Sequence, residues 1–215
     1  MPRSGSTFSF NIAREILSRR TPTTCKVTED IYDAITGSNT RCIIIKNHNV
    51  NEFGINLLKI DAMKGICTIR DPYEAIESTM DIFGFDIDQS IHSFQLWVDS
   101  FNQFHEQSLI ISFKNIEQFP AHAIWRISRH LGFIPSPLEL YKLVKKYNKK
   151  SIMKISHEID PQDRHVTDVG FSYYNNENLF HRRHVRKEKN VSLSNAEIQH
   201  IKNSLRNLDI LHTYL

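Results

Sequence analysis

GICTIRDPYEAIESTMDIF, residues Gly65–Phe83, joins a strand directly to a helix and so sets the fold class of this 215-residue chain. Its first part, GICTIRD, is a short apolar run of the kind that forms a buried strand in a parallel sheet. Pro72 suits the first position of a helix, and Asp71 with Glu74 has the spacing of a capping box. The stretch therefore predicts a strand that ends at Asp71 and a helix that follows at once and reaches about Phe83.

Strands and helices alternate on both sides of this stretch. RCIIIKNH (residues 41–48) is a continuous β-branched run that predicts a strand buried on both faces, and SLIISF (residues 108–113) predicts a further strand. Apolar spacing and capping residues predict helices over about 6–20, 28–35, 88–105, 120–131, 137–149 and 194–205. Residues 156–190 show no clear period, and we expect them to be mostly loop. No repeat or linker divides the chain, so we predict a single α/β domain over residues 1–215 with a parallel sheet flanked by helices.

The composition excludes several classes of protein. With 40% hydrophobic and 24% charged residues, the chain is typical of a soluble globular domain, and it has no apolar run long enough to span a membrane. Three cysteines, an odd number without metal-ligand spacing, argue against a disulfide framework or a zinc site and favour a reducing, cytoplasmic setting. A net charge of +3 falls short of a dedicated nucleic-acid-binding face.

The loop PRSGST, residues 2–7, leads directly into the first predicted helix. A glycine in a tight loop exposes backbone N–H groups, and the helix dipole adds partial positive charge at the same place. Hydroxyls of Ser4, Ser6 and Thr7 add donors, and Arg3 adds a guanidinium fork that suits phosphate oxygens. The loop therefore predicts an anion site, although a plain Ser/Thr-rich helix cap explains the same residues.

Two further polar groups stand where predicted strands end. Lys46 and His48 are two residues apart, so their side chains point the same way, and the carboxyl ends of parallel strands face the ligand crevice. A base beside a cation suits removal of a proton from a nucleophile, although two polar residues that merely end a strand are the simpler reading.

Arg70 ends the next strand, and Ser78 lies on the helix face that looks back toward it. This pair suits a second phosphate-sized anion site. The alternative is that Arg70 pairs with Asp71 or Glu74 and that Ser78 only packs.

Together, PRSGST, IKNH and IRDPYEAIES resemble the sulfotransferases that use 3'-phosphoadenosine 5'-phosphosulfate (PAPS). PRSGST resembles the 5'-phosphosulfate loop of that family, IKNH resembles its Lys-x-His strand end, and Arg70 with Ser78 has the separation of its 3'-phosphate motif. The resemblance implies a P-loop-like, three-layer α/β/α fold with a short central parallel sheet. It also implies a transferase that moves a sulfuryl group from PAPS to an acceptor hydroxyl or amine, releases 3',5'-ADP and needs no metal.

The resemblance also assigns roles to these residues. His48 is the expected general base, and Lys46 and Arg3 stabilise charge as the bond to sulfur breaks. The cofactor-binding set comprises Arg3, Ser4, Gly5, Ser6 and Thr7 at the 5' side and Arg70 and Ser78 at the 3'-phosphate. A basic segment, HRRHVRKEKN (residues 181–190), lies where the family places a loop over the 3'-phosphate, which makes Arg182, Arg183, Arg186 and Lys187 candidates.

The sequence departs from the family at two places. The family's Tyr-Glu-Asp-Leu core is replaced by Phe113-Lys114-Asn115-Ile116, and the strand that precedes the phosphosulfate loop in the family has no counterpart before Pro2. We expect that the start is truncated or misassigned.

Two alternatives to a sulfotransferase remain open: an inactive nucleotide- or partner-binding protein on this fold, and an atypical P-loop kinase. We expect residues 49–62 and 84–104 to bind the acceptor, which is a small molecule or a carbohydrate. Five aromatic residues there are candidates for an apolar pocket, although core packing is their more common role: Phe53, Phe83, Phe85, Phe94 and Trp97.

Overall fold

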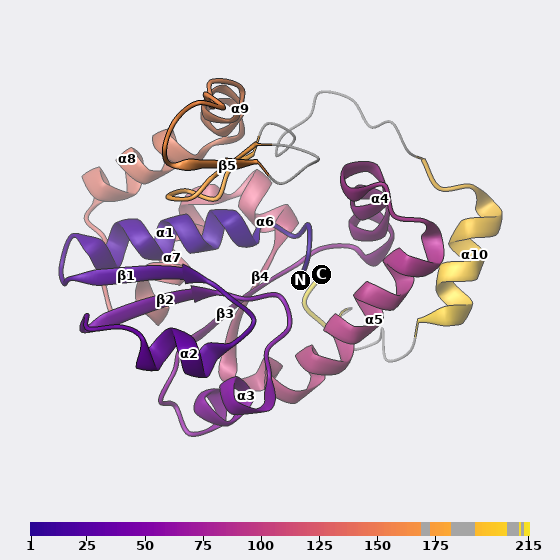
Figure 1. Ribbon diagram of the computed structural model, residues 1–215, viewed down its shortest axis with the longest axis horizontal. Helices are drawn as coiled ribbons and strands as arrows, with labels where there is room; N and C mark the ends of the chain where they lie inside the picture. The colour runs from indigo at the N-terminus through magenta and orange to yellow at the C-terminus, as the bar shows by residue number, and fades with distance from the viewer. Residues whose placement is uncertain (169–172, 182–191, 206–210, 212) are drawn as a thin grey trace.

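The computed structural model describes residues 1–168, 173–181, 192–205, 211 and 213–215, and it shows a mixed α/β fold (Figure 1). The strands are β1 Thr23–Val27, β2 Cys42–Lys46, β3 Gly65–Ile69, β4 Ser108–Ser112, β5 Val166–Asp168 and β6 Tyr173–Asn175. The helices are α1 Ser6–Ser18, α2 Ile31–Thr36, α3 Glu52–Lys59, α4 Pro72–Phe83, α5 Ile87–Phe104, α6 Phe113–Gln118, α7 Pro120–His130, α8 Pro137–Tyr147, α9 Lys149–His157 and α10 Asn195–Ser204. A 3₁₀ turn, His105–Gln107, joins α5 to β4.

The β3–α4 unit forms as the sequence predicts. The Asp71 side chain accepts a hydrogen bond from the Glu74 N–H, Pro72 opens α4, and Gly84 closes it in a left-handed conformation. Proline suits this position because the first N–H groups of a helix have no partner within the helix. Only the Asp71 half of the predicted capping box forms at α4, because the Glu74 carboxylate pairs with Arg70. A complete capping box opens α10, where Ser194 and Glu197 bond to each other's backbone N–H.

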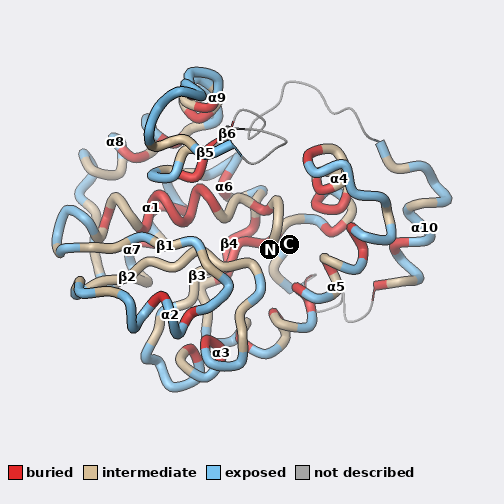
Figure 2. Tube along the Cα trace, viewed as in Figure 1, coloured by how far each residue is buried: buried red, intermediate tan, exposed pale blue. Residues whose placement is uncertain are grey.

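The parallel strands form two pairs rather than one continuous sheet. β1 pairs with β2, and β3 pairs with β4, with Ile69 opposite Ser112 at the carboxyl end. The prediction that residues 41–48 are buried on both faces is wrong: every residue of β2 is only half-buried (Figure 2). The reason is that, among the described residues, β2 has a hydrogen-bonded neighbour on one side only.

Two apolar cores lie on opposite faces of β4 and give the fold its three layers. Ile110 belongs to a core built with α3, α4 and α5, whereas the adjacent Ile111 belongs to a core built with α1 and α6–α9. Neighbouring residues of a strand point to opposite faces, so β4 is covered on both sides. Helix α1 contacts β1, β2 and β3 and therefore spans both strand pairs (Figure 1).

Several short elements were not predicted from the sequence. They are β1, α3 and α6, together with α9 and the antiparallel pair β5–β6. The described part of residues 156–190 is mostly turn and loop, as predicted, apart from the end of α9 and the β5–β6 pair. No helix in the described part of the chain is both long and apolar enough to cross a membrane.

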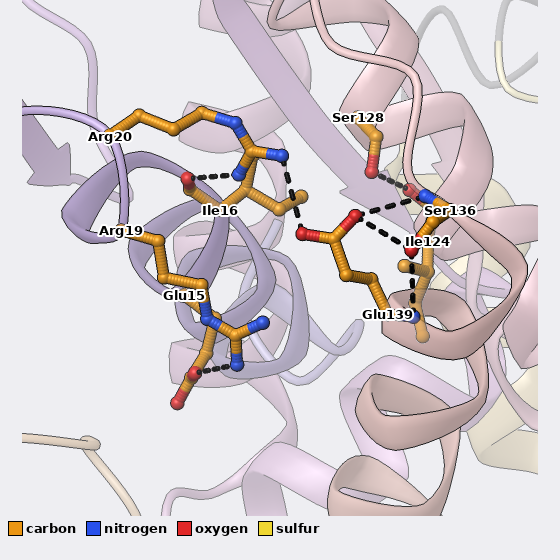
Figure 3. Close-up of polar contacts among 8 residues, drawn as sticks. All are labelled: Glu15, Ile16, Arg19, Arg20, Ile124, Ser128, Ser136 and Glu139. Atoms are coloured by element: carbon orange, nitrogen blue, oxygen red, sulfur yellow. Dashed lines mark hydrogen bonds and ion pairs between the residues drawn. The ribbon is translucent and has the colours of Figure 1, made fainter.

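The end of α1 is joined to the start of α8 by a polar contact (Figure 3). The Arg20 guanidinium donates to the Ile16 carbonyl at 2.7 Å and to a Glu139 carboxylate oxygen at 3.5 Å. The other oxygen of Glu139 accepts from the backbone N–H and the hydroxyl of Ser136, and these hydrogen bonds lower the pKa of Glu139. Within the neighbouring α7, the buried Ser128 hydroxyl donates to the Ile124 carbonyl. Because Glu139 accepts from both Ser136 and Arg20, the capping box of α8 also connects that helix to the end of α1.

Replacing Ser136, the N-cap residue of α8, tests how much the capping box contributes to stability. We expect Ser136→Ala to lower the free energy of unfolding by about 1 kcal/mol, because the first turn of α8 loses its side-chain acceptor. Urea unfolding measures the change, and Ser136→Asn, which keeps an oxygen at the cap, is the matched control. Equal stability of Ser136→Ala and the unmodified protein would contradict this role.

Candidate functional site

The loop before α1 has an unusual backbone. Arg3 and Gly5 both have positive φ angles, +56° and +90°. A Cβ added at Gly5 would lie 2.9 Å from Cδ1 of Ile116 and 3.2 Å from Cδ2 of Phe113, so a glycine is required there for conformation and for space. Gly5 is also the N-cap of α1. Because glycine has no side chain, it cannot accept a hydrogen bond from the N–H groups of Ser6 and Thr7 in the first turn of the helix.

The Ser4 side chain fastens this loop to β3. Its hydroxyl is fully buried and lies 2.8 Å from the Thr68 carbonyl oxygen, 2.7 Å from the Thr68 hydroxyl and 2.6 Å from the Met1 carbonyl oxygen. The hydroxyl is therefore engaged within the protein. Ser4 remains a predicted cofactor-binding residue through its backbone N–H, and not through the side chain that the sequence suggested.

Arg3, Arg70 and Ser78 lie together, although they come from the loop, the end of β3 and the middle of α4. The Arg3 Nε donates to the Ser78 hydroxyl at 3.1 Å, and an Arg70 terminal nitrogen lies 3.4 Å from the Arg3 carbonyl oxygen. Arg70 also pairs with Glu74 at 2.9 Å, which is one of the pairings that the simpler reading of the sequence allowed. The structure thus contains both the ion pair and the cluster.

Lys46 approaches the same loop from the end of β2. Its ammonium group donates to the Thr7 hydroxyl at 2.9 Å. Burial, and secondarily the positive charge of Arg3, lowers the pKa of Lys46 to about 8. The site therefore brings cations close together, an arrangement that a bound anion would relieve.

His48 lies in the same positive environment. Its Nδ1 atom is buried and has no hydrogen-bond partner among the described residues. Burial is the main reason that the pKa of His48 is lowered to about 3, and the amino group of Met1, Lys46 and Arg3 lower it further. The imidazole is therefore neutral at pH 7, and in this positive environment it is a weak base.

Phe113 is a site residue that sequence reasoning missed. It follows β4 directly, and its ring lies under the Arg70 guanidinium and beside Gly5. Sequence reasoning noted Phe113 only as part of the segment that departs from the family pattern, since its contact with Arg70 depends on the register that sets the ends of β3 and β4 side by side.

The predicted basic residues Arg182, Arg183, Arg186 and Lys187 lie outside the described residues. The chain just before them is placed against α1: Phe180 packs into the same core as Phe8 and Ile12, and the Asn11 amide donates to the Asn178 carbonyl at 2.6 Å. The same amide donates to the Thr7 carbonyl at 2.9 Å, so residues 178–181 lie near the first turns of α1.

The two segments expected to bind the acceptor line an open cavity of about 420 Å³ between α3 and α5. Its lining is mostly polar: Val50, Glu52, Ile55, Asn56, Lys59, Leu96, Asp99, Ser100 and Gln103. Of the five aromatic candidates, Phe94 and Trp97 are buried in the core, whereas Phe53, Phe83 and Phe85 are exposed. None of the five lines this cavity. In the described ranges, no three His, Cys, Asp or Glu side chains gather in a way that would hold a metal ion.

The loop geometry predicts a steric effect that can be isolated. We expect Gly5→Ala to lower the free energy of unfolding by about 1–3 kcal/mol, because it adds backbone strain and a close contact with Ile116. Gly132 has a similar φ of +85° but nothing within 4 Å of an added Cβ, so Gly132→Ala measures the strain alone. Urea unfolding of both variants gives the comparison, and an equal loss in the two would show that the close contact has no effect.

The lowered pKa of His48 predicts a pH dependence of stability. The unfolded chain binds a proton at His48 near pH 6.5, but the folded chain does so only near pH 3, so stability falls as the pH falls through this window. We expect His48→Gln to lose less stability over the same range, by up to about 1.4 kcal/mol per pH unit. Urea unfolding at several pH values tests this, with His92→Gln at an exposed position as the control. Parallel pH profiles for His48→Gln and the unmodified protein would contradict it.

Comparison with known proteins bears on the fold. No family model and no curated protein matches the sequence. Among solved structures, the chain is similar to the mouse sulfotransferase SULT7A1, which was crystallised in complex with PAP. The two are 14% identical with a TM-score of 0.66, and the alignment covers 99% of this chain and 84% of that one. The predicted α/β/α class is therefore confirmed, and the protein has the fold of the sulfotransferases that its three short motifs resemble.

Proposed function

We propose that this protein transfers a sulfuryl group from PAPS to an acceptor hydroxyl or, less favourably, an amine. One observation carries the proposal: Arg3, Arg70 and Ser78 form a single contact cluster, although they come from separate segments, and Lys46 joins the same loop through Thr7. A site built from several cations and hydroxyls at the start of a helix suits a ligand with more than one anionic group. The solved sulfotransferase of the same fold is a complex with PAP.

The two phosphates of the nucleotide would use different parts of the cluster. The backbone N–H groups of residues 4–7 at the start of α1 would hold the 5'-phosphate, with Arg3 and Lys46 balancing its charge. Arg70 and Ser78 would hold the 3'-phosphate, which distinguishes PAPS from ATP and AMP. Arg186 and Lys187 remain candidates to contact the 3'-phosphate, because the described chain before them ends beside α1.

His48 would act as the general base. The acceptor oxygen attacks sulfur as its proton passes to the imidazole, and the bond from sulfur to the bridging phosphate oxygen breaks. The leaving group is 3',5'-ADP, also called PAP. A bound anion beside Arg3 and Lys46 offsets the charges that lower the pKa of His48, so the imidazole becomes a stronger base when the nucleotide is in place.

The cavity between α3 and α5 is our candidate for the acceptor site. Val50 lines it and comes only two residues after His48, and the Ser100 hydroxyl donates to the Val50 carbonyl at 3.3 Å. Because the lining is mostly polar, it suits a hydroxyl-bearing small molecule or a carbohydrate better than a purely apolar acceptor.

Transfer of labelled sulfate from PAPS to a panel of hydroxyl-bearing acceptors tests the function. We expect His48→Ala to lower the transfer rate roughly a hundredfold or more, because the base is lost. The same variant should bind 3',5'-ADP about as tightly as the unmodified protein, which serves as the control for folding. A near-normal rate in His48→Ala would exclude His48 as the base.

A further inference from the structure

Phe113 and Arg70 meet because of the register between two strands. Ile69 pairs with Ser112 at the carboxyl ends of β3 and β4, so Arg70 and Phe113 are the first residues beyond each strand. The guanidinium carbon of Arg70 lies 4.5 Å from the centre of the Phe113 ring. This distance is within the range in which an aromatic face attracts a cation.

Three contacts together fix the Arg70 guanidinium. Phe113 covers one face, Glu74 accepts from Nε at 2.9 Å, and the Arg3 carbonyl oxygen lies 3.4 Å from one terminal nitrogen. A guanidinium has five N–H donors, and these contacts account for two of them. Stacking occupies the face and leaves the donor edge available, so the remaining N–H groups can serve an anion.

The same ring also limits the position of the loop before α1. A Cβ added at Gly5 would lie 3.2 Å from Cδ2 and 3.6 Å from Cε2 of Phe113. Phe113 thus touches both halves of the cluster: the loop assigned to the 5'-phosphate and the arginine assigned to the 3'-phosphate.

We propose that Phe113 is a positioning residue that holds Arg70 in the orientation required to bind the 3'-phosphate. This inference rests on the proposed function, since it assumes a ligand with a phosphate at that position. An arginine side chain has many rotamers, and fixing it before binding removes the entropy that the ligand would otherwise have to offset. Phe113 acts through Arg70, so its effect should be specific to ligands that carry the 3'-phosphate.

Calorimetric titration of Phe113→Leu tests the inference. We expect affinity for 3',5'-ADP to fall by about threefold to thirtyfold, the range that corresponds to loss of one cation–π contact. Affinity for 5'-AMP, which lacks the 3'-phosphate, should change much less. Phe113→Tyr keeps the aromatic face and should restore the preference for 3',5'-ADP.

A matched control comes from elsewhere in the chain. Arg20 stacks on Phe133 at 4.6 Å, and Phe133 is half-buried like Phe113, but this pair lies near α8. Phe133→Leu should therefore leave the ratio of the two affinities unchanged. In an Arg70→Ala background, Phe113→Leu should no longer change the ratio of the two affinities, because its partner is gone.

The outcomes separate the inference from the function on which it rests. Equal losses for both nucleotides in Phe113→Leu would show that the ring only supports the loop, which overturns the positioning role. An unchanged ratio would overturn it as well. If the unmodified protein does not prefer 3',5'-ADP to 5'-AMP, the proposed function fails and the inference fails with it. If Phe113→Leu does not fold, the ratio in Phe113→Met decides by the same criteria.

Discussion

The buried hydroxyl of Ser4 is the contact on which the site depends. It joins the loop before α1 to the Thr68 backbone of β3, and the same loop contains the positive φ angles of Arg3 and Gly5. With the loop held there, the Arg3 guanidinium reaches Ser78 on α4, and the first turn of α1 meets Lys46 from β2. A single buried polar contact therefore places residues from four segments around one point, and its burial makes it costly to break.

The electrostatics of the cluster explain why it suits an anion. Arg3 and Lys46 are close enough that each disfavours the charge of the other, and burial adds to the cost at Lys46. Glu74 is a carboxylate that balances Arg70, and it is half exposed. The repulsion between these cations is unfavourable in the free protein. A doubly anionic ligand offsets it, which favours binding of such a ligand over a less charged one.

Local patterns in the sequence predicted the elements that local chemistry determines. Asp71, Pro72 and Glu74 marked the start of α4 correctly, because a helix cap is made by neighbouring residues. The short strand β1 carries no such signal, since it is five residues long and partly exposed, and it is a strand because β2 lies beside it. The half-buried state of β2 was also beyond the sequence, because burial depends on the helices packed on its faces and on the strands beside its edges, which only the tertiary structure shows.

The candidate site likewise combines features that the sequence predicts with features that only the tertiary structure shows. The separation of Arg70 and Ser78 suggested one shared anion site, but the residue that both of them contact is Arg3, whose place depends on how the loop is held. Ser4 was expected to offer its hydroxyl to a ligand, and only the tertiary structure shows that β3 takes it. The sequence marked Phe113 only as a departure from the family's Tyr-Glu-Asp-Leu core. Its contact with Arg70 could not be predicted, because that contact depends on the register between β3 and β4.

In the proposed site, one cluster recognises two phosphates on a single nucleotide. Isothermal titration of the unmodified protein with 3',5'-ADP, 2',5'-ADP and 5'-AMP measures this recognition. We expect 3',5'-ADP to bind at least tenfold more tightly than the other two nucleotides, because a charge-assisted contact worth about 1.4 kcal/mol or more is made by one ligand alone. Equal affinity for all three nucleotides would show that the cluster does not recognise the 3'-phosphate, and the proposed two-phosphate site would be wrong.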